Sequence, residues 1–232
     1  MSHVSHLTSH YAIIVAGGSG SRMQSAVPKQ FLLLNGKPVL MHAVEAFYHS
    51  TSKPQILIVL PEAYQSQWEQ LCQSHQFEVP YTLVNGGETR FHSVKNAVDS
   101  IEGDSDALVA VHDAVRPLIR EDIINESYKT AARSGNAIAA LKSRDSVRQL
   151  KNGASISLLR DEIYLVQTPQ TFQLTQLKKA YEQPFDDAFT DDASVVEAAG
   201  YPIHLIEGSY FNIKITFPED IVIAEKLMVD RP

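Results

Sequence analysis

One stretch near the start of the chain limits most strongly what the chain can fold into. The apolar run of residues 12–16 is typical of a buried strand. Three glycines follow it closely: Gly17, Gly18 and Gly20. Glycines after a buried strand let the backbone turn sharply and bring its N–H groups close to an anion. Because Arg22 and Lys29 come next, the stretch predicts a site for a nucleoside triphosphate.

Two well-known phosphate-binding motifs do not fit this stretch. The dinucleotide fingerprint needs a third glycine where Met23 stands, and the P-loop needs Gly-Lys-Ser/Thr after four intervening residues. A plain glycine turn with solvated charges is the alternative. The preceding strand, the arginine within the loop and the sequence Pro28-Lys29-Gln30 together favour phosphate binding.

The chain then alternates between apolar runs and helical patterns. Strands are predicted at residues 56–60, 81–84, 107–111 and 137–141, and helices at residues 38–48, 63–75, 93–100 and 122–134. This rhythm is typical of parallel strands joined by right-handed crossovers. We therefore expect an α/β fold of the Rossmann-like kind, with a mostly parallel twisted sheet flanked by helices.

The last third of the chain is expected to complete this fold. Further elements are predicted at residues 166–172 (an extended or turn segment containing Pro169), 174–181 (a helix), 203–206 and 212–215 (strands). Thr190 or Asp191 is a natural cap for another helix, which is the main rival to a binding role for Thr190. Thr216 and Glu219 predict a capping box that starts the terminal helix.

Charged residues follow the strand predicted at residues 107–111. Asp113 and Arg116 can meet one ligand there, because a carboxylate binds hydroxyls or a metal and a guanidinium binds phosphate. A simple Asp–Arg salt bridge is the alternative. His112 is expected to be a hydrogen-bonded structural residue. Lys214 lies in an apolar setting, so we expect it to be paired.

A second glycine loop, residues 85–90, leads into the helix predicted at residues 93–100. Loops at the carboxyl ends of parallel strands are where such sheets bind ligands. An ordinary turn between strand and helix is the alternative.

Residues 142–160 break the alternating pattern. They are polar, and Asn152-Gly153 between short alternating flanks is a strong signal for a β-hairpin. A polar hairpin has little core of its own and is marginal in isolation. We therefore expect an arm that packs on a second copy of the chain, with a mobile surface flap as the alternative.

Composition excludes several classes of function. A net charge of −7 without a basic block argues against a nucleic-acid partner, and no apolar run reaches the roughly 18 residues of a membrane helix. The single cysteine, Cys72, fits a reducing compartment such as the cytoplasm. Residues 1–10, with histidines at positions 3, 6 and 10, are expected to be a disordered extension, and residues 11–232 a single domain.

Taken together, the motifs resemble one family. They occur in this order: AGGSGSRM, PKQF, GGETRFHSV, VHDAVRP, the arm with Arg160, QTPQTF, TDDAS and NIKITFPED. This set is similar to the 2-C-methyl-D-erythritol 4-phosphate cytidylyltransferases of the non-mevalonate isoprenoid route. Ribitol-5-phosphate cytidylyltransferases share several of the segments, but TDDAS resembles the erythritol enzymes more.

The resemblance implies a role for each matching position. Arg22 and Lys29 would stabilise the transition state at the α-phosphate of CTP. The groups that would hold the nucleotide are the backbone of Ala16, Gly17, Gly18, Gly87 and Ala114 and the side chain of Ser93. Those that would hold the methylerythritol phosphate are Asp113, Arg116, Thr190 and Lys214, with Ser146 and Arg160 from the partner's arm. Ser21, Ser146 and Phe211 depart from the commoner family pattern, which weakens any claim of an acidic metal ligand at position 211.

The implied chemistry needs no general base. The nucleophile is a phosphate monoester whose second pKa is about 6, so it is largely ionised already. The difficulty is the repulsion between the attacking phosphate dianion and the negatively charged triphosphate. Local cations and Mg²⁺ reduce this repulsion. We expect Mg²⁺ to be held mainly by the nucleotide phosphates, with Asp113 a weaker candidate ligand. A hypothesis of another class is a nucleotide sensor that binds CTP without releasing pyrophosphate.

Overall fold

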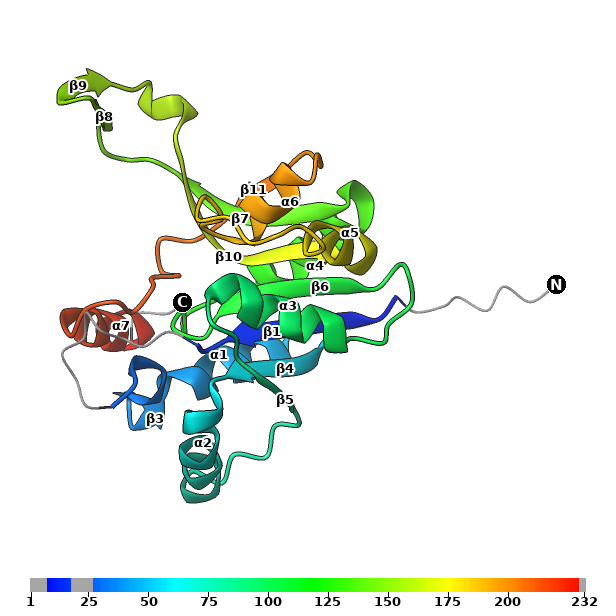
Figure 1. Ribbon diagram of the computed structural model, residues 1–232. Helices are drawn as coiled ribbons and strands as arrows, with labels where there is room; N and C mark the ends of the chain where they lie inside the picture. Colours follow the sequence, from blue (N-terminus) through cyan, green and yellow to red (C-terminus); the bar gives the residue numbers. More distant parts are fainter. Residues whose placement is uncertain (1–7, 18–26, 230–232) are drawn as a thin grey trace.

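A seven-stranded sheet forms the centre of the computed structural model, which describes residues 8–17 and 27–229 (Figure 1). The strands are β1 (His10–Val15), β4 (Gln55–Leu60), β5 (Thr82–Asn85), β6 (Leu108–Asp113), β7 (Asn136–Lys142), β10 (Tyr164–Gln173) and β11 (Leu205–Glu207). Their order is β11-β7-β10-β6-β1-β4-β5. Strand β10 runs antiparallel to β6 and β7, and the other neighbouring pairs are parallel. The predicted mostly parallel α/β fold is confirmed.

Helices cover both faces of the sheet. One face packs against α1 (Val39–His49), α2 (Glu62–Ser74) and α4 (Glu121–Ser134), and the other against α3 (Arg90–Ser100), α5 (Leu174–Ala180) and α6 (Asp192–Ala198). Successive strand side chains point to opposite faces, so Ala12 and Ile14 join the first cluster while Ile13 joins the second. A sheet buried on both faces needs strands that are apolar throughout, which explains their continuous apolar runs.

A smaller apolar cluster lies beyond the first glycine stretch. It joins Leu34 of the short strand β2 (Leu33–Leu34), Val39 of α1, Ile215 before the terminal helix and Ala224 of that helix, α7 (Glu219–Val229). Strand β2 pairs with the short strand β3 (Lys37–Pro38). A single 3-10 turn, η2 (Lys29–Phe31), leads into the cluster. This cluster fixes the place of Lys29 at one end and of Lys214 at the other.

The predicted hairpin stands away from the body of the molecule (Figure 1). Its strands are β8 (Arg148–Lys151) and β9 (Ala154–Ser157), and every residue of both is exposed. Asn152 and Gly153 have φ values of 52° and 78°, the left-handed pair that a two-residue hairpin turn requires. The hairpin prediction is therefore confirmed, together with the position of its turn.

Strand β10 is longer than the sequence indicated. We expected only an extended or turn segment at residues 166–172, because proline cannot donate to a strand ladder. Pro169 lies where the register of β10 shifts, between Val166 and Gln170, so the ladder continues on both sides of it. The irregularity turns Gln167 and Thr168 away from the ladder and toward the site described below.

Two predictions near the carboxyl terminus are wrong. Residues 212–215 form no strand, because their backbone bonds go to separate partners instead of one neighbouring strand. Thr216 and Glu219 form no capping box: the Asp220 carboxylate accepts from the backbone N–H of Thr216 and of Phe217, at 2.7 and 2.8 Å. The helix begins at Glu219, which leaves Thr216 too far upstream to cap it.

His10 is part of the sheet, whereas the sequence places it in a disordered extension. It opens β1, and its ring stacks on Tyr128 with the ring centroids 4.5 Å apart. His3 and His6 lie outside the described residues. Within residues 8–17 and 27–229, no helix is both long and apolar enough to span a bilayer.

Candidate active site

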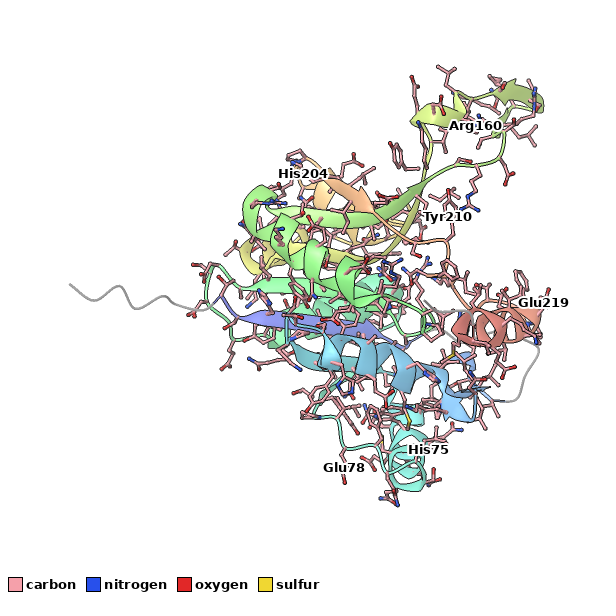
Figure 2. The ribbon with its side chains drawn as sticks, turned by 180° about the vertical axis from the view of Figure 1, so that it is seen from behind. His75, Glu78, Arg160, His204, Tyr210 and Glu219 are labelled. Carbon is pink, nitrogen blue, oxygen red and sulfur yellow. The ribbon has the colours of Figure 1, made fainter. Side chains whose placement is uncertain are left out.

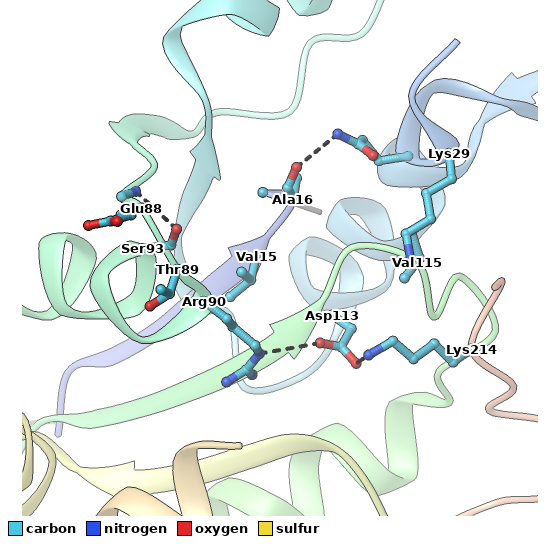
Figure 3. Close-up of a pocket in the computed structure, with 13 residues that line it drawn as sticks. Val15, Ala16, Lys29, Glu88, Thr89, Arg90, Ser93, Asp113, Val115 and Lys214 are labelled. Carbon is cyan, nitrogen blue, oxygen red and sulfur yellow. Dashed lines mark hydrogen bonds and ion pairs between the residues drawn. The ribbon is translucent and has the colours of Figure 1, made fainter. Parts of the chain in front are cut away.

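The main candidate site is a cavity of about 190 Å³ at the carboxyl ends of β1 and β6 (Figure 3). Its lining comes from the end of β1, the η2 turn, the second glycine loop with the start of α3, the end of β6 and the segment before α7. The residues are Val15, Ala16, Gly17, Lys29, Gln30, Gly87, Glu88, Thr89, Arg90, Ser93, Asp113, Val115 and Lys214. Both glycine loops predicted from sequence therefore contribute to one cavity.

The second glycine loop is closely packed against α3. A Cβ on Gly87 would lie 2.5 Å from the Cβ of His92, so only glycine fits there. The N–H of Gly87 donates to Ser93 Oγ at 3.0 Å, and the Thr89 side chain caps the first turn of α3. The amino terminus of α3 thus faces the cavity, which favours an anion there.

The first glycine stretch is held by the side chain of Gln30. Its amide donates to the carbonyl of Ala16 at 2.8 Å and ties the η2 turn to the end of β1. Ala114, predicted to hold the nucleotide through its backbone, donates its N–H to Val15 and does not line the cavity; Val115 does. Gly18 and Arg22 lie outside the described residues.

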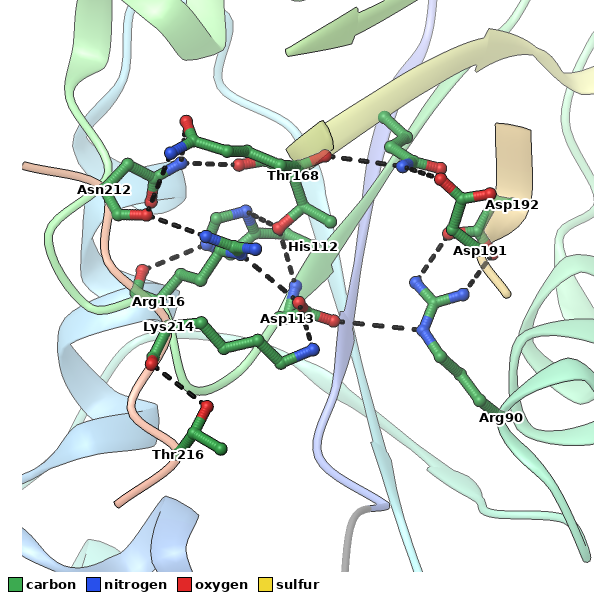
Figure 4. Close-up of polar contacts among 12 residues, drawn as sticks. Arg90, His112, Asp113, Arg116, Thr168, Asp191, Asp192, Asn212, Lys214 and Thr216 are labelled. Carbon is green, nitrogen blue, oxygen red and sulfur yellow. Dashed lines mark hydrogen bonds and ion pairs between the residues drawn. The ribbon is translucent and has the colours of Figure 1, made fainter. Parts of the chain in front are cut away.

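Three cations from different parts of the chain surround Asp113 (Figure 4). Its carboxylate lies 2.9 Å from Lys214 Nζ, 3.3 Å from Arg116 Nε and 3.8 Å from Arg90 Nε. Burial alone would raise the pKa of this carboxyl, but the three cations hold the pKa well below its usual range. Asp113 is therefore ionised at neutral pH, and the expected pairing of Lys214 is present.

Arg90 has no predicted role, although it belongs to the third of the quoted motifs, GGETRFHSV. It makes two hydrogen bonds with the fully buried carboxylate of Asp192, at 3.0 and 2.6 Å, and Tyr181 donates to the same carboxylate at 2.6 Å. Burial would lower the pKa of Arg90, but Asp192 and Asp113 raise it. The pair joins residues 102 positions apart, so spacing along the sequence gave no signal for it.

His112 is structural, as expected. It is fully buried, and its Nε2 donates to the carbonyl of Arg116 while Thr168 donates to its Nδ1, at 3.1 and 3.0 Å. The Thr168 hydroxyl in turn accepts the backbone N–H of Asp113 at 3.1 Å. Burial lowers the pKa of His112 to about 4, so the ring is neutral at neutral pH.

Besides Ala114, four of the predicted residues that the structure describes do not line this cavity: Arg116, which contacts the lining residue Asp113, and Thr190, Ser146 and Arg160. Thr190 is exposed and directly precedes Asp191, which caps α6 in a capping box with Ser194. Ser146 and Arg160 are exposed residues of the arm, and Figure 2 shows Arg160 well away from the sheet. A single chain therefore places Asp113, Arg116 and Lys214 together, but not the two arm residues.

The described residues offer no protein cage for a metal. No group of three or more histidine, cysteine, aspartate or glutamate side chains among them could hold an ion. Asp113, the weaker candidate ligand, has both carboxylate oxygens directed at cations. These side chains do not fit a metal site made by the protein alone.

Glycine loops and cations around one cavity, at the carboxyl ends of parallel strands, define an α/β nucleotidyltransferase. Solved structures of similar fold agree. The 4-diphosphocytidyl-2C-methyl-D-erythritol synthase from Anaerococcus prevotii has a TM-score of 0.81 at 26% identity, covering 96% of each chain. The 2-C-methyl-D-erythritol 4-phosphate cytidylyltransferase of Francisella tularensis has a TM-score of 0.78 at 32% identity, covering 95% of this chain and 100% of that one.

Sequence comparison gives the family. The profile of 2-C-methyl-D-erythritol 4-phosphate cytidylyltransferase (IspD) matches residues 10–230. The enzyme of that name from Bacteroides thetaiotaomicron is 48% identical over 93% of this chain and 98% of its own length, and that from Bacteroides fragilis 46% identical over 94% and 98%. The chain belongs to the 2-C-methyl-D-erythritol 4-phosphate cytidylyltransferase family, as its motifs indicated.

Proposed function

We propose that the chain transfers the cytidylyl group of CTP to 2-C-methyl-D-erythritol 4-phosphate, giving 4-diphosphocytidyl-2-C-methyl-D-erythritol and pyrophosphate. Family membership over nearly the whole chain supports this reaction, and the relatives named above do not favour ribitol 5-phosphate. The proposal depends mainly on the cavity, which Lys29, Asp113 and Lys214 line together with both glycine loops.

The reaction is an in-line displacement at phosphorus. An oxygen of the substrate phosphate attacks the α-phosphorus of CTP, a new P–O bond forms, and the bond to the bridging oxygen of the β-phosphate breaks. The attacking phosphate is already ionised, so the protein supplies no general base. Negative charge gathers at the α-phosphate, and Lys29, with Arg22, would stabilise it there.

The nucleotide half of the site would be the two glycine loops. Ala16 and Gly17 close one side of the cavity, and Gly87 with Ser93 closes the other. Gly18 belongs to the same stretch as Ala16 and Gly17. Ala114 would support the nucleotide site from behind its lining, because its N–H already donates to the carbonyl of Val15.

The polyol phosphate would occupy the side of the cavity near Asp113. Its hydroxyls suit the carboxylate as acceptor, and its phosphate suits Lys214 and Arg116. The Lys214 side chain is 44% exposed, so its ammonium can turn from Asp113 to a ligand at little cost. Thr190 would contribute from the start of α6.

A second copy of the chain would complete the site. The arm is exposed along both strands and carries Ser146 and Arg160, which the proposal assigns to the partner's cavity. Mg²⁺ would arrive with the phosphates of CTP and relieve their charge, and no described residue is assigned as its ligand. The reducing environment of the cytoplasm suits the one cysteine, Cys72.

The test is a direct assay of pyrophosphate. The protein is incubated with CTP, Mg²⁺ and either 2-C-methyl-D-erythritol 4-phosphate or ribitol 5-phosphate. We expect rapid release with the first and little with the second. Faster release with ribitol 5-phosphate would assign the other activity, and CTP binding without release from either would indicate a nucleotide sensor.

A further inference from the structure

Tyr210 lies at the root of the arm, the end that joins the sheet, and far from the hairpin turn at Asn152-Gly153 (Figure 2). Its hydroxyl donates to the carbonyl of Lys142 at 2.8 Å, and the guanidinium of Arg144 stacks over its ring at 3.1 Å from the centroid. Lys142 is the last residue of β7, where the chain leaves the sheet for the arm. Tyr210 thus holds the outgoing chain by two independent contacts.

The returning chain of the arm is tied to the same root. The N–H of Ser143 donates to the carbonyl of Ile163 at 2.9 Å, and Arg160 donates to the carbonyl of Arg144 at 3.2 Å. Arg144 therefore bridges Tyr210 and Arg160. Any change in the direction of the arm at its root must act on the ring of Tyr210.

Tyr210 belongs to a connecting segment, residues 208–215, that runs from β11 to the cavity. Gln167 holds the first part of the segment by bonds to both the N–H and the carbonyl of Ser209, at 3.2 and 2.9 Å. The side chain of Asn212 is fully buried and donates to the carbonyl of Thr168 at 2.8 Å. A Cβ on Gly208 would lie 2.5 Å from Gln167 Oε1 and 3.3 Å from the carbonyl oxygen of Ala140, so glycine lets the segment pass close to both groups.

The far end of the connecting segment is part of the cavity. The carbonyl of Asn212 accepts from Arg116 at 2.8 Å, and Lys214 pairs with Asp113 at 2.9 Å. Tyr210 and Lys214 are four residues apart, at most about 14 Å along the chain. Packed segments move between discrete positions instead of stretching, so a shift at Tyr210 passes on to Lys214.

We propose that Tyr210 is a positioning residue that couples the direction of the arm to the ammonium of Lys214 in the same chain. The inference rests on the proposed role of Lys214 toward the polyol phosphate. In a dimer joined by the arms, the contact between Tyr210 and the arm would direct Arg160 toward the partner. The same contact would position Lys214 in the cavity of its own chain. Docking of the arm then prepares both sites at once.

The experiment compares steady-state kinetics of the full-length native protein, Tyr210→Ala and Tyr210→Phe at protein concentrations where light scattering shows equal dimer content. Displacing a binding group by about 1 Å can cost up to about a hundredfold. We expect Tyr210→Ala to raise KM for 2-C-methyl-D-erythritol 4-phosphate about tenfold, with KM for CTP within about twofold of native. Tyr210→Phe keeps the ring under Arg144 and should restore most of the loss.

Tyr48→Ala is a matched control. Tyr48 is about as exposed as Tyr210, 36% against 40%, and has its own cation over the ring, Lys53 at 5.7 Å. It lies at the end of α1 and does not line the cavity. We expect unchanged kinetics from this variant. Equal increases of both KM values in Tyr210→Ala, or an equal effect of Tyr48→Ala, would overturn the inference.

Two further variants separate this inference from the proposed function. Lys214→Ala should raise KM for the polyol phosphate by itself, and Tyr210→Ala should then add nothing, because the tyrosine acts through the lysine. Additive effects would overturn the coupling while leaving the role of Lys214 intact. No effect of Lys214→Ala would instead remove the role assigned to Lys214 in the proposed function.

Discussion

Lys29 is the described residue whose removal should cost most in rate. It stands on the half-buried η2 turn and faces the cavity, and its proposed work is on charge that develops only during attack. Lys29→Ala should therefore lower kcat by on the order of a hundredfold or more. Lys37→Ala is a suitable control, since that lysine pairs with Glu45 at 2.7 Å and does not line the cavity. Near-native turnover of Lys29→Ala would remove the assignment.

His112 should make the stability of the fold depend on pH. Burial lowers its pKa to about 4 from an ordinary 6.5, so between these values the unfolded chain holds a proton that the folded chain does not. The free energy of unfolding should fall as the pH falls from about 6.5 toward 4, by up to about 3 kcal/mol for this group.

The measurement is urea unfolding at several pH values for the native protein and for His112→Gln. The variant is expected to be less stable at pH 7, because it loses a packed ring, but to show a shallower fall in acid. Parallel curves for the two proteins would mean that another group is responsible for the dependence.

At the scale of elements, local patterns along the sequence predicted most of the secondary structure. The parallel strands and their helices, the hairpin turn at Asn152-Gly153 and the cap at Asp191 all depend on neighbouring residues. The length of strand β10 was underestimated. Proline is normally excluded from a strand ladder, and the sequence does not indicate the register shift that accommodates Pro169.

The site was predictable only where its members lie at strand ends or in loops of recognisable composition. Asp113 ends β6, Arg116 follows it and Lys214 precedes α7, and the structure brings the three together. The pairing of Arg90 with Asp192 depends on α3 and α6 packing side by side on one face of the sheet, which only the three-dimensional fold determines.

At the scale of the whole molecule, the prediction concerns an active site shared between two chains through the arm. If each site combines Lys29 of one chain with Arg160 of the other, two inactive variants, Lys29→Ala and Arg160→Ala, should complement each other when subunits exchange. Random pairing makes about half the dimers mixed, and one of the two sites in each mixed dimer is complete, so about a quarter of all sites should recover.

Exchange itself must be established by mass, using one variant labelled with a heavy isotope. If Arg160 serves its own chain, every site of a mixed dimer lacks one residue and no activity returns. Absence of recovery with exchange confirmed would therefore exclude a shared site, whereas recovery near a quarter would also establish the arm as the link between the two copies.

The three cations around Asp113 have a consequence for which molecules the cavity rejects. Free inorganic phosphate or sulfate has only charge to offer, and it would compete with Asp113 for Arg116, whose side chain is as buried as the carboxylate, each 11% exposed. Removing a partner from a buried ion pair costs about 3–5 kcal/mol, whereas the more exposed Lys214 can turn away at little cost. A molecule that brings hydroxyls for Asp113 together with a phosphate for the cations compensates both sides. The cluster would thereby favour a polyol phosphate over simple anions such as phosphate and sulfate.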